Sequence, residues 1–178
     1  MFALTRILVP TNLGEPSRAA ITYGVAFARQ FGAQLFLVHV LPARELVAAL
    51  ETERVMEVLS PEALRTAESS PDLDPDAVAR NAARLDLEGL LSPEDEAATR
   101  AEYLLRGSGL AGPGDAIVAC AAELGVELIV MGKHRLGFVE HLIAGSVTEK
   151  VIRHAPCPVL IVQHPEHEFV VADPVPTR

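Results

Sequence analysis

Three basic residues and a glycine–serine step stand close together in the last third of this 178-residue chain. Residues 133–135 read Lys-His-Arg and follow the apolar run 128–131, and Gly145-Ser146 precedes a segment with helical spacing. A helix that begins at this step presents unpaired backbone amides and the positive end of its dipole, which favour an anion. In a chain of net charge -9, this local positive group predicts an anion-binding site. The alternative is that Ser146 only caps the helix and that the basic residues lie in a solvated loop.

A second glycine-rich stretch, 107–112, has the spacing G-x-G-x-x-G between an expected strand and an expected helix. This pattern is typical of dinucleotide-binding sites, but these also hold the ribose with an acidic residue after the next strand. Here that strand ends at Met131-Gly132 without an acidic residue, so we interpret the stretch as a flexible turn. Lys133 and Arg135 could suit a ribose phosphate, which leaves an NADP-binding enzyme as a remote alternative.

Familiar catalytic motifs are missing from the sequence. It contains no P-loop, no G-x-S-x-G nucleophile elbow and no H-E-x-x-H zinc motif. His39 lies inside an expected strand and is predicted to be packed, and His164 and His167 belong to a polar tail rather than to a metal site. We therefore predict no catalytic residue and no metal ligand.

Apolar runs bounded by glycine or proline predict five parallel strands, at 6–10, 34–41, 102–106, 128–131 and 158–162. Helical spacing predicts helices between them, at 15–31, 43–59, 76–91, 115–124 and 146–154. Alternating strands and helices with right-handed crossovers define a doubly wound α/β fold. The long connection 42–99 is either a lid or interaction surface, or a tolerated surface insertion. Residues 164–178 should form an extended polar tail.

The composition limits the function classes. A hydrophobic fraction of 49% in 178 residues suits a single domain, and the low aromatic fraction of 4% predicts an aliphatic core. The acidic balance argues against nucleic-acid binding. The two cysteines, Cys120 and Cys157, are too few for a disulfide framework or a zinc site. No stretch has the length needed to span a bilayer, so we expect a cytoplasmic protein.

Four segments resemble the universal stress protein family: ILVPTN near the start, LFLVHVL in the second expected strand, ELGVELIVMGKH around the fourth and, most specifically, GSVTEKVIRHAPCPVLIVQ. The resemblance implies one domain over 1–163, with 42–99 as an insertion. It implies a three-layer, five-stranded parallel sheet of order 3-2-1-4-5, Rossmann-like and similar to the adenine nucleotide alpha hydrolases. It also implies a homodimer formed through the last strand, 158–163, and no established catalytic reaction.

One branch of this family binds ATP or another adenine nucleotide, and another branch does not. The binding branch carries G-x-x-G, nine residues and then G-S or G-T; Gly132 and Gly145-Ser146 match, whereas Arg135 replaces the second glycine. Asn12 replaces the family's aspartate that meets the adenosine, and its amide can still bind a ribose hydroxyl. Arg135 could block the site or reach the phosphates. The implied nucleotide-binding residues are Pro10, Thr11, Asn12, Val40, Met131, Gly132, His134, Arg135, Gly145, Ser146, Val147 and Thr148.

The implied strand order also places the site. Order 3-2-1-4-5 reverses direction between the first and fourth strands, and ligands bind in the crevice beyond the strand ends at such a point. The stretch 107–112 follows an edge strand and is expected away from this crevice.

Two main hypotheses follow. In the first, the chain is a cytoplasmic stress-response regulatory or sensing protein that binds ATP or a related adenine nucleotide. Mg²⁺ could accompany the nucleotide, and the protein would at most hydrolyse ATP slowly. In the second, it is a nucleotide-free interaction module of the same fold. In both, the partners are a second copy of the chain and an unknown regulatory protein, and neither nucleic acid nor a membrane is involved.

Overall fold

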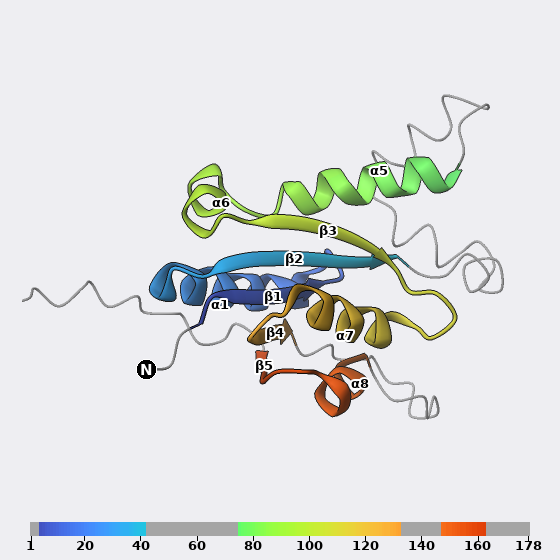
Figure 1. Ribbon diagram of the computed structural model, residues 1–178. Coiled ribbons are helices and arrows are strands. Elements are labelled where there is room, and N and C mark those ends of the chain that lie inside the picture. Colours follow the sequence, from blue (N-terminus) through green and yellow to red (C-terminus); the bar gives the residue numbers. More distant parts are fainter. Residues whose placement is uncertain (1–3, 42–74, 133–146, 163–178) are drawn as a thin grey trace, which may run out of the picture.

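The computed structural model describes residues 4–41, 75–132 and 147–162 (Figure 1). The expected helix 43–59 and the tail 164–178 lie outside the described residues. In chain order the elements are β1 (Arg6–Thr11), α1 (Glu15–Phe31), β2 (Gln34–Leu41), α5 (Pro75–Glu88), α6 (Pro93–Thr99), β3 (Glu102–Gly107), α7 (Pro113–Leu124), β4 (Leu128–Gly132), α8 (Val147–His154) and β5 (Val159–Val162).

The strands form one parallel sheet of order β3-β2-β1-β4-β5, which confirms the predicted fold class and strand order. In the register of β1 and β2, Thr11 lies opposite His39. On its other side β1 pairs with β4, with Ile7 opposite Leu128. β1 is therefore the central strand, and the strand order reverses beside it.

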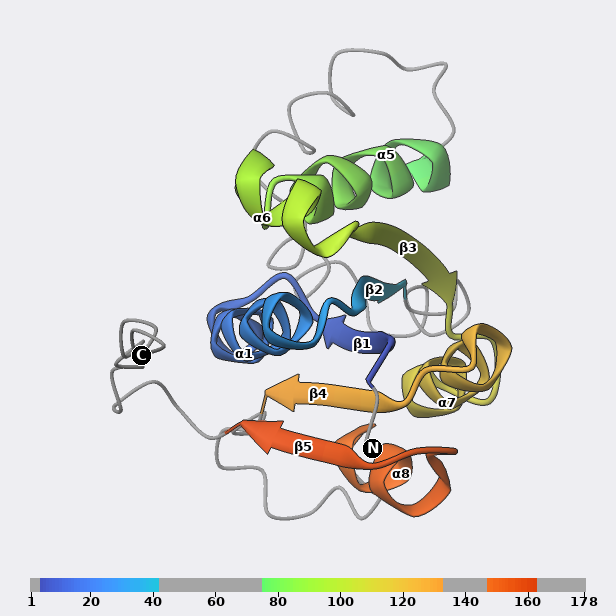
Figure 2. The ribbon, with the colours of Figure 1, turned by 60° about the vertical axis from the view of Figure 1, so that its left-hand side comes forward.

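Helices cover both faces of this sheet (Figure 2). Successive side chains of a strand point to opposite faces, so Ile7 and Val9 join the cluster beneath α1, whereas Leu8 joins the cluster beneath α7 and α8. The core is largely aliphatic, as the composition predicts, although Phe36 is also buried in it. Cys120 is buried in the second cluster and Cys157 packs against it, and both are free thiols.

Helix ends follow the local sequence, with two corrections to the predicted bounds. α1 ends at Gly32, whose φ of 65° is left-handed and whose N–H donates to the Ala28 carbonyl. α7 begins at Pro113 instead of Asp115, because Gly112 turns the chain at φ 96° and the proline suits the first helical position. α5 ends at Glu88, earlier than the predicted residue 91.

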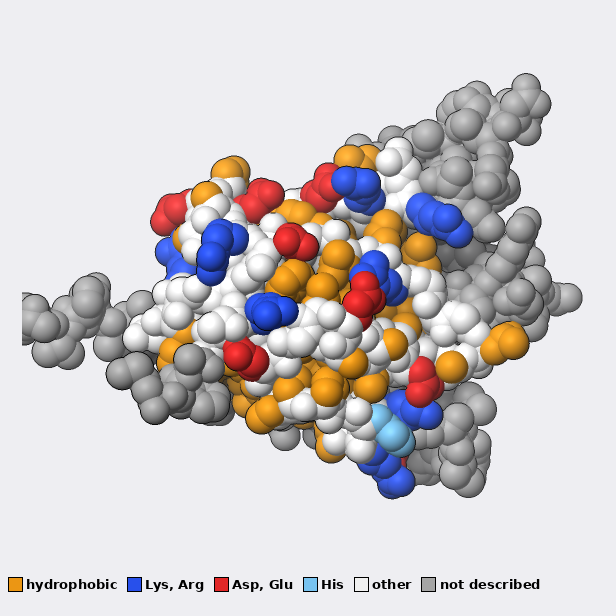
Figure 3. Space-filling view, viewed as in Figure 1, with side chains coloured by type: hydrophobic (Ala, Val, Ile, Leu, Met, Phe, Trp, Pro, Cys, Tyr) orange, Lys and Arg blue, Asp and Glu red, His pale blue; other side chains and the backbone are white. Residues whose placement is uncertain are grey.

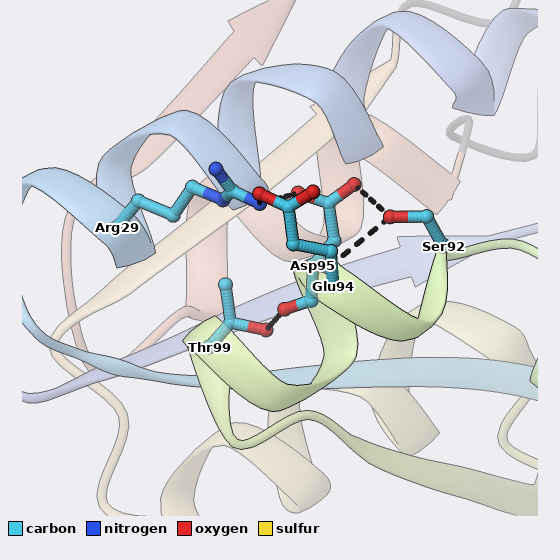
Figure 4. A network of polar contacts seen from close by, with 5 residues as sticks. All are labelled: Arg29, Ser92, Glu94, Asp95 and Thr99. Carbon is cyan, nitrogen blue, oxygen red and sulfur yellow. Dashed lines mark hydrogen bonds and ion pairs between the residues drawn. The ribbon is translucent and has the colours of Figure 1, made fainter.

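The described part of the insertion packs against the rest of the domain. Leu87 of α5 is fully buried in the α1-side cluster. In α6, the Ser92 hydroxyl accepts from the Asp95 amide at 3.1 Å, and Asp95 also pairs with Arg29 of α1 at 2.8 Å (Figure 4). These charged groups are partly exposed, so the pair contributes at most about 1 kcal/mol. Apolar burial by α5 is the stronger attachment.

Gly24 in the middle of α1 gives a first test of the packing. A Cβ at this position would lie 2.5 Å from Cγ2 of Val9, whose side chain is fully buried and β-branched. Gly24→Ala should therefore lower the free energy of unfolding by about 1–3 kcal/mol, although alanine favours an ordinary helix by about 1 kcal/mol. Urea denaturation measures this difference.

Gln30→Ala is the matched control because Gln30 is exposed on the same helix. Its free energy of unfolding should stay within about 0.5 kcal/mol of the wild type. A stabilised Gly24→Ala protein would contradict the close contact between α1 and β1.

Candidate functional site

A cavity of about 270 Å³ lies at the carboxyl ends of β1, β2 and β4, beside the reversal in strand order. Its floor is apolar. Val38 and Val40 of β2 point to the α7 side of the sheet, where they meet Ile117 of α7 and Met131 of β4. Pro10 at the end of β1 completes this slot. Such a surface can hold a flat, weakly polar group such as a heteroaromatic ring.

A polar turn after β1 forms the lip of the cavity. The Asn12 side-chain oxygen accepts from the Gly14 amide at 3.1 Å and from the Ser17 hydroxyl at 2.6 Å. In return, the Ser17 oxygen accepts from the Asn12 amide at 3.1 Å. Leu13 adopts a left-handed φ of 64°, and its amide donates to Oγ1 of Thr11 at 3.0 Å. Three side chains therefore fix the backbone between β1 and α1.

The first residues of α8, Val147 and Thr148, form another wall. The position of this helix depends on Gly114 in α7, where a Cβ would lie 2.8 Å from the Lys150 side chain. Glycine thus allows α7 and α8 to approach closely. The positive end of the α8 dipole lies at the cavity, where it favours a negatively charged group.

His39 lies on the opposite face of β2 from Val38 and Val40, and only 8% of it is exposed. Its Nδ1 is 2.9 Å from the Thr11 carbonyl oxygen, so the neutral tautomer with hydrogen on Nδ1 donates to that carbonyl. Burial lowers the pKa of His39 below its ordinary value of 6.5, and the Thr11 hydrogen bond and the charge of Asp86 oppose this only in part. His39 is thus the packed histidine that its strand position predicts.

A second hollow, of about 450 Å³, lies between the start of α7 and the outer face of α8. It is lined by Lys150, Arg153 and His154, and Figure 3 shows a histidine among basic side chains over α8. Lys150 is paired with Asp115 at 3.2 Å, and Arg153 with Glu149 at 2.7 Å. Because these cations already have acidic partners, the hollow is a weaker candidate for an anion than the cavity at the strand ends.

The structure gathers a large part of the predicted site around the first cavity. The gathered residues are Pro10, Thr11, Asn12, Val40, Met131, Gly132, Val147 and Thr148. The remaining predicted residues, His134, Arg135, Gly145 and Ser146, lie outside the described residues.

Sequence reasoning missed five lining residues, namely Ser17, Val38, His39, Pro113 and Ile117. Val38 could have been found, because it shares the face of Val40 two residues away. Pro113 could not, since the stretch 107–112 was expected away from the crevice. None of residues 107–112 lines the cavity, but α7 starts directly after Gly112 and brings Pro113 to it.

The glycines of that stretch have local structural explanations. Gly109 and Gly112 have left-handed φ angles of 54° and 96°. The Gly112 amide donates to the Ser108 carbonyl at 3.1 Å, and the Ser108 amide donates to the Leu41 carbonyl at 2.9 Å. The spacing G-x-G-x-x-G thus forms a turn between β3 and α7, and the hydrogen bond from Ser108 to Leu41 joins this turn to β2.

The described ranges contain neither a cluster of metal ligands nor a membrane-spanning helix. Within 4–41, 75–132 and 147–162, no group of His, Cys, Asp and Glu side chains is arranged to hold a metal ion. Over the same ranges, no helix combines the length and apolar character that crossing a bilayer requires.

Fold and cavity together define a class, the doubly wound α/β proteins with a ligand-sized cavity where the strand order reverses. Comparison with known proteins gives the family. The chain belongs to the universal stress protein family, whose family model matches residues 3–163. This confirms the resemblance seen in the sequence.

Two relatives show how the similarity is distributed. A Staphylococcus haemolyticus protein assigned to the universal stress proteins is 54% identical over 46 residues, which are 26% of this chain and only 28% of that protein. A universal stress protein of Methanocaldococcus jannaschii is 26% identical over 166 residues, 92% of this chain and 84% of the relative.

Solved structures share the fold. Universal stress protein UspA from Lactobacillus plantarum aligns with TM-score 0.59 at 25% identity, over 91% of this chain and 99% of that one. A universal stress protein in complex with cAMP aligns with TM-score 0.54 at 21% identity, over 91% and 98% of the two chains. The universal stress protein of Archaeoglobus fulgidus in complex with dAMP aligns with TM-score 0.52 at 19% identity, over 90% and 98%.

The buried neutral state of His39 predicts a pH dependence of stability. Because its pKa is lower in the folded protein than the ordinary 6.5, the unfolded chain binds more protons at this side chain as the pH falls. Its contribution is fully present above pH 6.5 and is lost as the pH falls toward the folded-state pKa. Urea unfolding between about pH 7.5 and 5 should show this slope in the wild type and a smaller slope in His39→Asn.

His154→Asn is the control, because His154 is exposed. It should retain the wild-type slope. Identical slopes for the wild type and His39→Asn would show that His39 is not held neutral by burial.

Proposed function

We propose that this universal stress protein binds an adenine nucleotide in the cavity at the ends of β1, β2 and β4. The single observation that carries the proposal is the cavity itself, in which an apolar slot and the start of α8 lie next to each other. The slot suits a base, and the helix start suits a phosphate. The cAMP and dAMP complexes of proteins with this fold support the choice of adenine.

The described lining residues suit different parts of the nucleotide. Val40 and Met131 would make apolar contacts with the base. Thr148 would donate hydrogen bonds from its hydroxyl and its backbone amide to phosphate oxygens. The described lining of the cavity contains no carboxylate. A Mg²⁺ ion that accompanies ATP would therefore be held chiefly by phosphate oxygens and water, as Mg²⁺ often is.

The proposed role is regulatory or sensory, in the cytoplasm. Among the described lining residues His39 is the main candidate for proton transfer, and it is held on the other face of β2 by the Thr11 carbonyl. Binding therefore has a clearer physical basis in this cavity than catalysis. The competing function is a nucleotide-free interaction module, which the substitutions at positions 12 and 135 favour.

The cavity can be tested by filling it. Val40→Trp places a large ring in the apolar slot, so it should weaken binding of ATP and AMP by at least about tenfold, or about 1.4 kcal/mol. Isothermal titration calorimetry measures the dissociation constants, and circular dichroism checks that the variant folds.

Leu110→Trp is the matched control, because Leu110 is 94% exposed and lies outside the cavity lining. It should bind as tightly as the wild type. Absence of binding to ATP, ADP, AMP and cAMP by the wild type would refute the proposal and leave the interaction module.

The family's dimer is a further part of the proposal, with β5 as the contact. β5 is an edge strand, and unpaired edges favour pairing with another strand. The Pro158 carbonyl accepts from the Ile129 amide of β4 at 3.0 Å. Since backbone groups alternate in direction along a strand, the amides of Val159 and Ile161 face the free edge.

Ile161→Pro removes one outward amide and leaves the hydrogen bonds to β4 in place. The wild type should have about twice the 19.0 kDa chain mass in light scattering, and Ile161→Pro should shift toward the chain mass at the same concentration. Ile161→Val keeps the amide and should remain dimeric. A wild type of 19.0 kDa would refute the dimer.

A further inference from the structure

The orientation of the Asn12 carboxamide is fixed by its neighbours. The Gly14 amide can only donate, so the side-chain atom 3.1 Å from it must be the oxygen Oδ1. The Ser17 hydroxyl donates to the same oxygen at 2.6 Å. An amide oxygen has two lone pairs, and both are therefore used inside the turn.

The remaining polar atom of Asn12 is its nitrogen, Nδ2. Among the described residues Nδ2 has no hydrogen-bond partner, and Asn12 is exposed and lines the cavity. Gly14 keeps room for the carboxamide, because a Cβ there would lie 3.3 Å from Oδ1 and 3.4 Å from Nδ2. Toward a ligand, Asn12 is thus a hydrogen-bond donor only.

An aspartate at this position would satisfy the same turn with one oxygen and present the other to the ligand. Position 12 would then be an anionic acceptor, which suits the two hydroxyls of a free ribose and repels a phosphate. Asn12 shifts this preference toward phosphate. Its uncharged Nδ2 can donate to an anionic phosphoryl oxygen, whereas a ribose hydroxyl can only accept from Nδ2 and finds no acceptor there for its own hydrogen. The substitution leaves the turn unchanged and alters only the chemistry of the lip.

The part of a nucleotide that meets this lip follows from the cavity. If the base occupies the apolar slot and the 5′-phosphate the start of α8, the sugar between them would lie near Asn12, which lines the same cavity. We propose, on the basis of the nucleotide-binding function above, that Asn12 makes the cavity favour adenine nucleotides with a phosphoryl oxygen on the 3′ side of the ribose. Adenosine 3′,5′-cyclic monophosphate and adenosine 3′,5′-bisphosphate share this chemistry, and AMP lacks it.

Calorimetric titration of the full chain with these three nucleotides tests the proposal in the wild type and in Asn12→Asp. The aspartate variant should weaken the two 3′-phosphorylated ligands by at least about tenfold and bind AMP as well as or better than the wild type does. The quantity compared between the two proteins is the dissociation constant of each 3′-phosphorylated ligand divided by that of AMP. A uniform loss of affinity for all three ligands therefore does not count as support. The cyclic and the bisphosphate ligand together distinguish a ring phosphate from a free one.

Two further variants control for charge and orientation. Asn81→Asp adds the same charge at an exposed position of α5 outside the cavity lining, and it should keep the wild-type ratio. Ser17→Ala removes one of the two hydrogen bonds that orient the carboxamide, and it should reduce the preference for the 3′-phosphorylated ligands. Unchanged ratios in Asn12→Asp, with binding intact, would overturn the role of Asn12 alone. A wild type that binds none of the three would overturn the nucleotide-binding function as well.

Discussion

The cavity depends on the central place of β1 in the sheet. β1 pairs with β2 on one side and with β4 on the other, so the chain must wind in both directions from it. α1 follows β1 on one face, whereas α8 lies on the opposite face with α7. Helices that leave neighbouring strands on opposite faces diverge at the strand ends. The space between them is the cavity, and the side chains of β2 and β4 form its floor.

The turn after β1 shows how structure and recognition share the same atoms. Leu13 occupies a left-handed conformation that costs a non-glycine residue about 1–2 kcal/mol. The hydrogen bonds of Thr11, Asn12 and Ser17 hold it there. Because these bonds use the Asn12 oxygen, the geometry of the backbone decides which atom of that side chain remains for a ligand. Such strain is expected where a backbone must be shaped for binding.

The two edges of the sheet differ in whether a helix covers them. α5 packs against β3 and β2, with Leu87 fully buried, so this part of the insertion covers one edge region. Within the described ranges, β5 has no such helix beyond it. A covered edge resists pairing with another strand, and an open one favours it. Within the described ranges β5 is thus the open edge, which is where the proposed dimer would form.

Local sequence determined the elements. Apolar runs located every strand to within one residue at either end, and Gly32 and Pro156 marked the ends of α1 and α8. These signals are short-range, because a cap, a proline or an alternating pattern acts over a few residues. The family segments added the strand order and most of the lining residues that the structure gathers.

Tertiary structure alone decided which distant residues meet. Pro113 and Ile117 reach the cavity because α7 crosses beneath β2 and packs on α8, a contact that Gly114 permits and no local pattern indicates. Ser17 lies only five residues from Asn12, yet its role depends on the exact path of the turn between them. The sequence determined that position 12 carries an amide. Only the fold decided which end of that amide is free, because the partners of its oxygen are set by where the backbone places Gly14 and Ser17.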